Sequence, residues 1–166
     1  FIKIKQKFGA RSVVFGQGMP KGLEHFVLIR LANLFGSPNV VAVQDVCHAP
    51  REVSGLHTCG FYPVVDFHHQ SRLIMLWGSN PTSTNEEGQI CSLMLDQIKQ
   101  GVDVIVIDPR KTELAKKAKY WLQIRPGTDH ALALAFLNVI ITEKRYDNEF
   151  VGNWSHGFEE LSEYVR

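Results

Sequence analysis

Polar residues whose side chains could bind a ligand follow three apolar runs of the sequence, at the point where each run ends. These segments are 77–82, 107–112 and 125–129. The apolar runs before them have the length and continuity of strands covered on both faces. Ligands of open parallel sheets bind beyond the carboxyl ends of the strands, so the three segments are candidate parts of one site.

The first segment reads Trp77-Gly78-Ser79-Asn80-Pro81-Thr82. Gly78 would let a backbone approach a ligand closely, and the side chains of Ser79, Asn80 and Thr82 are short and polar. The helix expected to follow offers free N–H groups and a positive dipole end, which suit a phosphate. The same residue types also suit an ordinary helix-capping turn, and both interpretations remain open for this segment alone.

The second segment reads Ile107-Asp108-Pro109-Arg110-Lys111-Thr112. Asp108 closes an apolar run, about where a dinucleotide-binding fold places the carboxylate that holds a ribose hydroxyl. Pro109 stiffens the turn, and Arg110 could stack on a base or pair with a phosphate. The alternative is that Asp108 has only a structural role and stabilises the turn.

The third segment reads Arg125-Pro126-Gly127-Thr128-Asp129. Thr128 or Asp129 would cap the helix that follows. Asp129 could instead accept two N–H donors from a guanine edge, because a carboxylate presents two oxygens side by side. Three such turns in successive strand–helix units, all at one edge of a sheet, favour a nucleotide site.

A fourth turn, Gly16-Gln17-Gly18-Met19-Pro20-Lys21-Gly22, resembles the Gly-x-Gly-x-x-Gly phosphate turn, but its third glycine comes one residue late. A near match of this kind has little specificity. The alternative is a flexible loop between a strand and a helix.

Strand-like and helix-like patterns alternate along the chain, which predicts the α/β class. We expect a three-layer, Rossmann-like, mostly parallel sheet with helices on both faces, plus part of a neighbouring α/β domain. The expected strands are 12–15, 39–43, 73–77, 102–107 and 121–124. The expected helices are 22–35, 84–100, 112–119 and 129–144, and 50–60 is expected to be irregular with a possible short helix. The expected domains are 1–70, 71–145 and 146–166.

Composition excludes several classes of partner. The 166 residues include 18 basic and 17 acidic ones, and the formal net charge of +1 gives no electrostatic reason to expect a nucleic acid or a membrane surface. The longest apolar stretch, Ala131 to Ile141, is too short to insert into a membrane. The chain begins with Phe1 rather than Met and enters a helix-like segment directly, so we expect it to be a piece of a longer protein. It shows no signal peptide, which by itself says little about location.

The three cysteines, Cys47, Cys59 and Cys91, are odd in number and lack Cys-x-x-Cys spacing, which argues against a disulfide framework or a complete cysteine-rich metal site. A zinc-binding module remains an alternative of a different class. Its ligands would come from Cys47, His48, His57 and Cys59, with His68 and His69 further along. An ordinary nucleotide-binding module is a third alternative, although the sequence lacks Gly-x-x-x-x-Gly-Lys and a regular Gly-x-Gly-x-x-Gly.

Together, the motifs Trp-Gly-Ser-Asn-Pro, Asp-Pro-Arg-x-Thr and Arg-Pro-Gly-Thr-Asp-x-Ala-Leu resemble the molybdopterin oxidoreductases of the dimethyl-sulfoxide-reductase family. The resemblance runs from about Phe8 to Leu161 and includes 36–39, 146–150 and 157–161. It implies a fragment of a large catalytic subunit in which two pterin guanine dinucleotides hold one molybdenum or tungsten. The residues implied along one dinucleotide are Trp77, Gly78, Ser79, Asn80, Pro81, Thr82, Ile107, Asp108, Pro109, Arg110, Thr112, Gly127, Thr128 and Asp129.

The resemblance also implies a metal ligand and a catalytic residue. Cys47 would bind the metal as a soft thiolate, and His48 would handle the substrate proton beside it. The order of residues from Cys47 to Pro50, which is cysteine, histidine, any residue and proline, is similar to a motif of the formate dehydrogenases. Arg51 differs, because those enzymes usually have serine or threonine there. The segment 150–154 resembles acetylene hydratase, a non-redox member of the family, which keeps that alternative open.

The rest of the enzyme implied by the resemblance lies outside this chain. It includes an amino-terminal [4Fe–4S] cluster and the domain that binds the second dinucleotide. The implied partners are a small-molecule substrate and an iron–sulfur electron-transfer subunit. The isolated fragment is therefore expected to be inactive.

Overall fold

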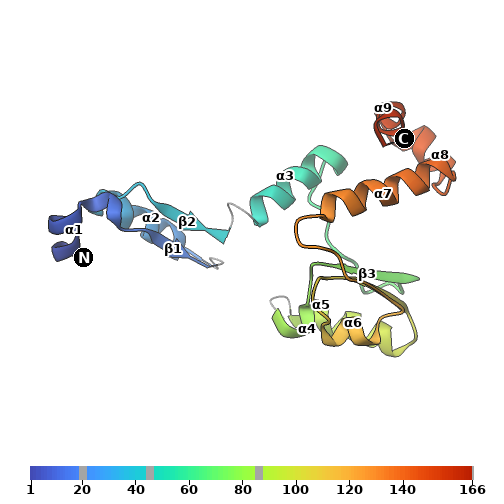
Figure 1. Cartoon of the computed structure of the whole chain (residues 1–166), viewed down its shortest axis with the longest axis horizontal. Helices are drawn as coiled ribbons and strands as arrows, with labels where there is room; N and C mark the ends of the chain where they lie inside the picture. Colours follow the sequence, from blue (N-terminus) through green and yellow to red (C-terminus); the bar gives the residue numbers. More distant parts are fainter. Residues whose placement is uncertain (19–21, 44–46, 85–87, 166) are drawn as a thin grey trace. The chain divides into compact units, whose positions relative to one another are not determined.

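The computed structural model describes residues 1–18, 22–43, 47–84 and 88–165, which form two compact units, Phe1–Val65 and Asp66–Arg166 (Figure 1). Helices and parallel strands occur in both units, so the predicted α/β class is confirmed. None of the described helices is both long enough and apolar enough to cross a membrane.

The first unit is built on a pair of short parallel strands, β1 (Phe15–Gln17) and β2 (Val40–Ala42). Helix α2 (Glu24–Phe35) connects them and ends at Gly36, whose φ of 91° lies in the left-handed region that favours glycine. Helix α1 (Ile2–Phe8) and the 3₁₀ turn η1 (Ala10–Ser12) precede β1. The strand expected at 12–15 therefore begins only at its last residue.

Helix α3 (His48–Cys59) corrects the expectation of an irregular segment at 50–60. Pro50 lies in the first turn of the helix, where backbone N–H groups have no helical acceptor. The N–H that proline lacks is therefore not missed there. It ends at Gly60, where φ is 77° and the N–H donates to the Leu56 carbonyl oxygen at 3.0 Å. Capping at Gly60 therefore sets the carboxyl end of this helix.

The second unit holds a three-stranded sheet of β3 (Leu73–Trp77), β4 (Asp103–Ile107) and β5 (Tyr120–Leu122), parallel and in that order. Helices α5 (Gly88–Lys99) and α6 (Glu113–Lys117) pack on one face of the sheet. The core between them consists of Ile74, Leu76, Cys91, Met94, Val104, Val106, Leu114 and Ala115. Cys91 is a free thiol buried in this core.

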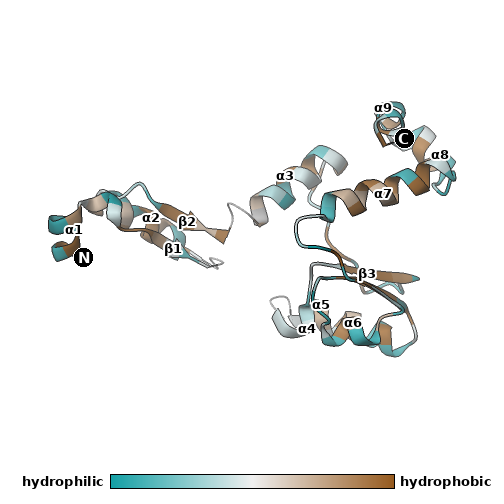
Figure 2. Cartoon of the chain, in the orientation of Figure 1, coloured by the Kyte–Doolittle hydropathy of each residue, from teal (hydrophilic) through white to brown (hydrophobic). Residues whose placement is uncertain are grey.

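Helix α7 (Asp129–Thr142) follows β5 and is hydrophobic over most of its length (Figure 2). Its Phe136 contacts Trp77 at the end of β3. Helices α8 (Asn148–Trp154) and α9 (Phe158–Val165) close the chain. Asn138 of α7 donates a hydrogen bond from Nδ2 to the Val165 carbonyl oxygen at 2.6 Å, which ties α9 to α7. This bond satisfies the one polar side chain that interrupts the apolar run of α7.

The loop before β3 is held by one buried side chain of α5. Gln97 donates from Nε2 to the carbonyl oxygens of Phe67 and His69, both at 2.8 Å, and its Oε1 accepts from the Ser71 N–H at 3.0 Å. Asp66 begins the same loop and accepts from His69 Nδ1 at 2.6 Å, which lowers the pKa of Asp66 and raises that of His69. These contacts fix the entry into the first strand of the sheet.

Candidate functional site

Asp108 follows directly after β4 and is only 2% exposed. Its Oδ1 accepts from the backbone N–H of Arg110 at 2.7 Å and from Arg110 Nε at 3.4 Å. Its Oδ2 has no hydrogen-bond partner among the residues that the structure describes. A buried carboxylate oxygen without a donor is costly, so this atom is an open acceptor suited to a ligand hydroxyl.

The charge state of Asp108 is set mainly by the turn itself. The backbone N–H of Arg110 lowers the pKa of this carboxyl and outweighs the raising effect of burial, and the Arg110 side chain lowers it further. Asp108 is therefore an ionised, acceptor-only group at neutral pH.

Two side chains of the β5 segment hold the Asp-Pro-Arg turn in place. Trp121 donates from Nε1 to the Asp108 carbonyl oxygen at 2.9 Å, and Gln123 donates from Nε2 to the Pro109 carbonyl oxygen at 3.0 Å. The Arg110 side chain is 74% exposed, and no bond to a described residue occupies its terminal amino groups. The turn therefore presents the exposed end of a guanidinium next to the open carboxylate oxygen.

Trp121 and Gln123 were not among the residues predicted for the site. The signal that could have found them is the strand register. Leu122 lies beside Ile107, so its two chain neighbours lie beside the end of β4 and the turn that follows.

Two other predicted site residues have structural partners. The side chain of Thr112 caps α6 by accepting from the Ala115 N–H at 3.1 Å, and Ile107 is fully buried in the core.

The turn after β3 lies beside the end of β4, because the Gly78 N–H donates to the Ile107 carbonyl oxygen at 2.8 Å. The φ of Gly78 is 58°, and a Cβ built there would meet no atom within 4 Å. The turn therefore leaves open space at Gly78, while its left-handed backbone favours glycine. Ser79 is exposed and makes no bond to a described residue.

Two side chains of the predicted segment 77–82 form hydrogen bonds within the turn itself. Asn80 precedes the short helix α4 (Pro81–Thr84) and donates from Nδ2 to Ser83 Oγ at 2.9 Å. Thr82 donates from Oγ1 to Asn80 Oδ1 at 3.1 Å. The Asn80 and Thr82 side chains thus have partners within the turn, whereas Gly78 and Ser79 face open space or solvent.

The turn before α7 brings Asp129 to the end of β3. Gly127 has a φ of 84°, and Thr128 donates from Oγ1 to the Arg125 carbonyl oxygen at 2.7 Å. Asp129 begins α7, and its Oδ1 accepts from Trp77 Nε1 at 2.7 Å. The ends of β3, β4 and β5 thus carry the predicted turns at one edge of the sheet, here called the carboxyl rim.

The carboxyl rim combines groups that suit different parts of one nucleotide. Asp108 offers a buried acceptor for a hydroxyl, Asp129 offers an exposed acceptor pair for N–H groups, and Arg110 offers a cation. Lys111 lies close by, with Nζ 5.4 Å from the centre of the Trp121 ring. Donors, acceptors and charges of this kind fit a ribose, a purine edge and a phosphate.

Cys47 belongs to the first unit and occupies the N-cap of α3. Its thiol is free and exposed, and its backbone N–H donates to the Val43 carbonyl oxygen at 2.9 Å. His48 is the first residue of α3, and its side chain lies outside the described part of the chain. The Arg51 guanidinium lies 5.2 Å from the centre of the Tyr62 ring. The exposed sulfur of Cys47 is a soft donor, which suits binding to a metal ion.

The zinc alternative does not fit α3. Cys47 and Cys59 lie at opposite ends of this helix, about 18 Å apart at 1.5 Å per residue. Two sulfurs of one tetrahedral zinc lie only about 4 Å apart, so these cysteines cannot share an ion. The described residues contain no group of three or more His, Cys, Asp or Glu arranged to hold a metal.

The turn at Gly16–Gly22 carries an internal acidic cap in its described part. The Gly22 N–H donates to Glu24 Oε1 at 3.0 Å at the start of α2. A carboxylate there repels a phosphate, which favours the loop interpretation. Residues 19–21 lie outside the described part of the chain.

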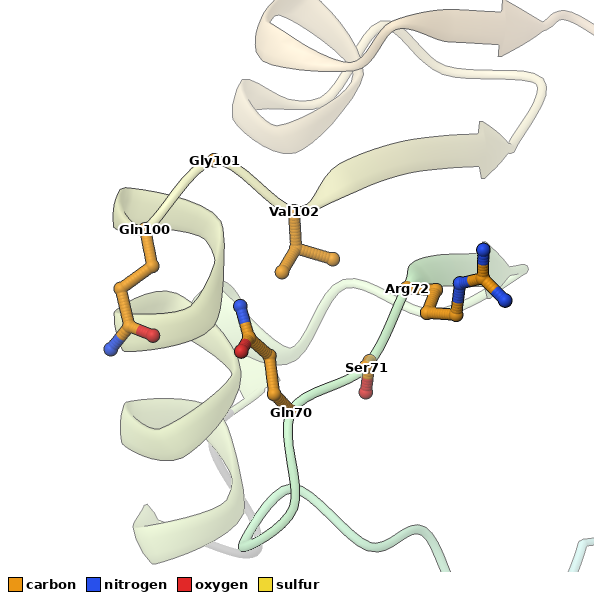
Figure 3. Close-up of a pocket in the computed structure, with 6 residues that line it drawn as sticks. All are labelled: Gln70, Ser71, Arg72, Gln100, Gly101 and Val102. Atoms are coloured by element: carbon orange, nitrogen blue, oxygen red, sulfur yellow. The ribbon is translucent and has the colours of Figure 1, made fainter.

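A pocket of about 440 Å³ lies at the opposite edge of the three-stranded sheet (Figure 3). Its lining consists of Gln70, Ser71, Arg72, Gln100, Gly101 and Val102. In Figure 3 the Arg72 side chain points away from the two glutamines, so no charge converges on the pocket. None of these residues was predicted as a site residue, and the pocket offers no chemistry of its own.

Comparison with known proteins identifies the family. The molybdopterin oxidoreductase family model matches residues 1–164. The chain is 40% identical over 167 residues to acetylene hydratase of Syntrophotalea acetylenica, covering 99% of this chain and 22% of that protein. It is 43% identical over 94 residues to the F420-dependent formate dehydrogenase subunit alpha of Methanocaldococcus jannaschii, covering 56% of this chain and 14% of that subunit.

A solved structure of acetylene hydratase from Pelobacter acetylenicus is also similar. It matches with a TM-score of 0.69 and 38% identity, over 99% of this chain and 22% of that one. The chain belongs to the molybdopterin oxidoreductase family and spans about a fifth of the length of acetylene hydratase. The predicted family is confirmed, and membership implies a pterin cofactor with molybdenum or tungsten.

Proposed function

We propose that this chain provides one guanine dinucleotide cradle and the protein metal ligand of a molybdenum or tungsten bis(pterin guanine dinucleotide) enzyme. The observation that carries the proposal is the buried Oδ2 of Asp108, an ionised acceptor without a partner among the described residues, at the same edge of the sheet as Asp129. An aspartate that only stabilised its turn would be expected to use both carboxylate oxygens in bonds within the protein.

Each group of the carboxyl rim has a distinct proposed task. Asp108 Oδ2 accepts a ribose hydroxyl, and Arg110 pairs with a phosphate or stacks on the base. Asp129 accepts the two N–H groups of the guanine edge. Gly78 lets the dinucleotide backbone approach closely, with Ser79 as a further donor. The remaining predicted residues, Trp77, Asn80, Pro81, Thr82, Ile107, Pro109, Thr112, Gly127 and Thr128, shape the turns around it.

Cys47 is the proposed protein ligand of the metal, since thiolate sulfur is a soft donor that suits such ions. His48 follows it directly, and a histidine can accept and release a proton near neutral pH. When bound, the metal–pterin group supplies the transfer of two electrons. The chain's own contributions are to bind the dinucleotide, provide the sulfur and move the proton at His48.

The proposed reaction is a two-electron conversion of a small substrate, similar to that of a formate dehydrogenase. The sequence Cys47-His48-Ala49-Pro50 and the similarity to a formate dehydrogenase subunit alpha support this proposal. The full-length protein would also carry a [4Fe–4S] cluster outside this chain and pass electrons to an iron–sulfur subunit. A non-redox hydratase is the second candidate, favoured by 40% identity to acetylene hydratase over 99% of the chain.

Cofactor analysis of the full-length protein tests the proposal. Acid hydrolysis should release guanine nucleotide together with molybdenum or tungsten, and a preparation that holds the metal but no guanine nucleotide would overturn it. Asp108→Asn should lower the bound guanine nucleotide. Asp103→Asn is the matched control because Asp103 lies at the other end of the same strand and pairs with Lys119 at 2.6 Å.

Substrate assays separate the two candidate reactions. A dehydrogenase should reduce a viologen dye when formate is added. A hydratase should consume acetylene without any electron acceptor. Formate-dependent dye reduction without acetylene consumption supports the first candidate, and the reverse result supports the second.

A further inference from the structure

The indole of Trp77 makes two contacts with α7. Its Nε1 donates to Asp129 Oδ1 at 2.7 Å, and its ring meets the Phe136 ring edge to face, with centroids 5.9 Å apart and planes at 78°. Phe136 follows Asp129 by seven residues, which is two helical turns, so both lie on one face of α7. Trp77 therefore lies along this face and holds the carboxylate at one end of it.

The Asp129 carboxylate has no other partner among the described residues. An ionised carboxylate has about four lone-pair sites on its two oxygens, and the Trp77 N–H occupies one of them. An exposed aspartate without such a bond would rotate among its side-chain conformations. The bond to the Trp77 indole, which packs against Phe136, restricts that rotation and leaves Oδ2 and one site of Oδ1 open.

We propose that Trp77 is a positioning residue, whose indole N–H orients Asp129 so that its open lone pairs receive the paired N–H groups of a guanine. This inference rests on the proposed function and adds a source of base selectivity. Adenine presents a ring-nitrogen lone pair where guanine presents an N–H, so a fixed carboxylate repels adenine. A freely rotating carboxylate would turn away from adenine and discriminate less.

Nucleotide binding to full-length protein produced without cofactor tests the inference, with GDP, IDP and ADP as probes. Wild type should bind GDP more tightly than ADP, with IDP between them, because IDP lacks the second N–H group. Trp77→Phe keeps the ring and loses the N–H. It should bind GDP roughly 5- to 20-fold more weakly and leave ADP binding unchanged, as expected for one charge-assisted hydrogen bond.

A double-mutant cycle separates positioning from packing. Asp129→Asn should reduce GDP selectivity, and adding Trp77→Phe to it should produce no further loss. Phe136→Leu removes the edge-to-face contact but keeps the hydrogen bond, so GDP selectivity should survive. Trp154→Phe is the control, since Trp154 is 80% exposed and distant in sequence from the carboxyl rim.

Three outcomes would overturn the inference. If Trp77→Phe binds GDP like wild type while Asp129→Asn does not, the guanine site stands and Trp77 only packs against α7. If Phe136→Leu weakens GDP binding as much as Trp77→Phe does, packing of α7 explains both variants. If wild type itself shows no preference for GDP over ADP, the proposed guanine site fails together with the inference.

Discussion

Trp121 Nε1 donates a hydrogen bond to the carbonyl oxygen of Asp108 at 2.9 Å, which links β5 to the turn that ends β4. The bond is partly buried, and it fixes the backbone of the residue whose carboxylate we assign to the ribose. The carboxyl rim thus depends on a side chain of the neighbouring strand.

Trp121→Phe should destabilise the second unit, because the Asp108 carbonyl oxygen loses its donor. We expect the free energy of unfolding to fall by about 1–2 kcal/mol, the usual cost of a partly buried hydrogen bond that loses one partner. Urea denaturation of the chain measures this change. Trp154→Phe, at an 80% exposed position, should leave the free energy unchanged, and equal effects of the two variants would contradict the role of Trp121.

Gln97 should be among the most sensitive polar residues of the second unit. It is 6% exposed and bonds three backbone groups of the loop before β3. Gln97→Met keeps the length of the side chain and leaves those groups without partners, so we expect a loss of about 2–4 kcal/mol of unfolding free energy. Gln100→Met, an exposed position just after α5, should change it by less than about 0.5 kcal/mol. A tolerated Gln97→Met would show that the loop is held by other contacts.

Ionisation of Asp108 should make the free energy of unfolding depend on pH. Its pKa in the folded chain is lowered, first by the Arg110 N–H, so the ionised form stabilises the fold above the pKa of the unfolded chain. This contribution is lost as the pH falls through the folded-state pKa. The difference in unfolding free energy between wild type and Asp108→Asn should be constant from pH 7 to about 5 and shrink below about 4. A difference that does not vary with pH would contradict the assignment.

Much of the second unit could be predicted from sequence, because its patterns are local. The continuous apolar run 73–77 gives β3 with correct limits, and the strand–helix alternation gives the parallel order. The position of Asp108 and Asp129 at one edge follows from the rule for carboxyl ends of parallel strands. Pattern alone therefore located the turns that carry the candidate site.

The contacts within the site could not be predicted in the same way. Trp77 and Asp129 are 52 residues apart, and their bond depends on where the indole packs against α7. The orphan oxygen of Asp108 is a property of side-chain packing, which periodicity does not report. The extent of α3 was underestimated, because Pro50, Gly55 and Gly60 are residues that usually interrupt helices. In the fold, Pro50 lies in the opening turn and Gly60 is the C-cap.

His48 is predicted to act in proton transfer. In the full-length protein, His48→Ala should retain the metal and lower turnover by roughly 10²- to 10⁴-fold, the usual contribution of a general acid or base. Metal content and steady-state rates measure the two effects separately. His57→Ala, in the same helix, is the control and should keep both. Loss of metal in His48→Ala alone would indicate a structural role for His48 at the metal rather than proton transfer.

Cys47 is predicted to bind the metal through sulfur. It is exposed at the N-cap of α3, so Cys47→Ala should change the free energy of unfolding by less than about 0.5 kcal/mol. In the full-length protein the same change should remove one sulfur from the metal coordination shell and abolish or strongly reduce turnover. X-ray absorption at the metal edge counts the sulfur ligands directly.

Cys59→Ala is the matched control for Cys47→Ala, because Cys59 is the other exposed cysteine of the same segment and lies at the far end of α3. It should leave the sulfur count and the turnover unchanged, since a ligand atom must lie within about 2.5 Å of its metal and the helix separates the two positions by about 18 Å. An unchanged sulfur count in Cys47→Ala would remove the ligand assignment. The argument for a formate-dehydrogenase-like site would then lose its basis, because that argument depends on a metal-bound Cys47 followed by His48.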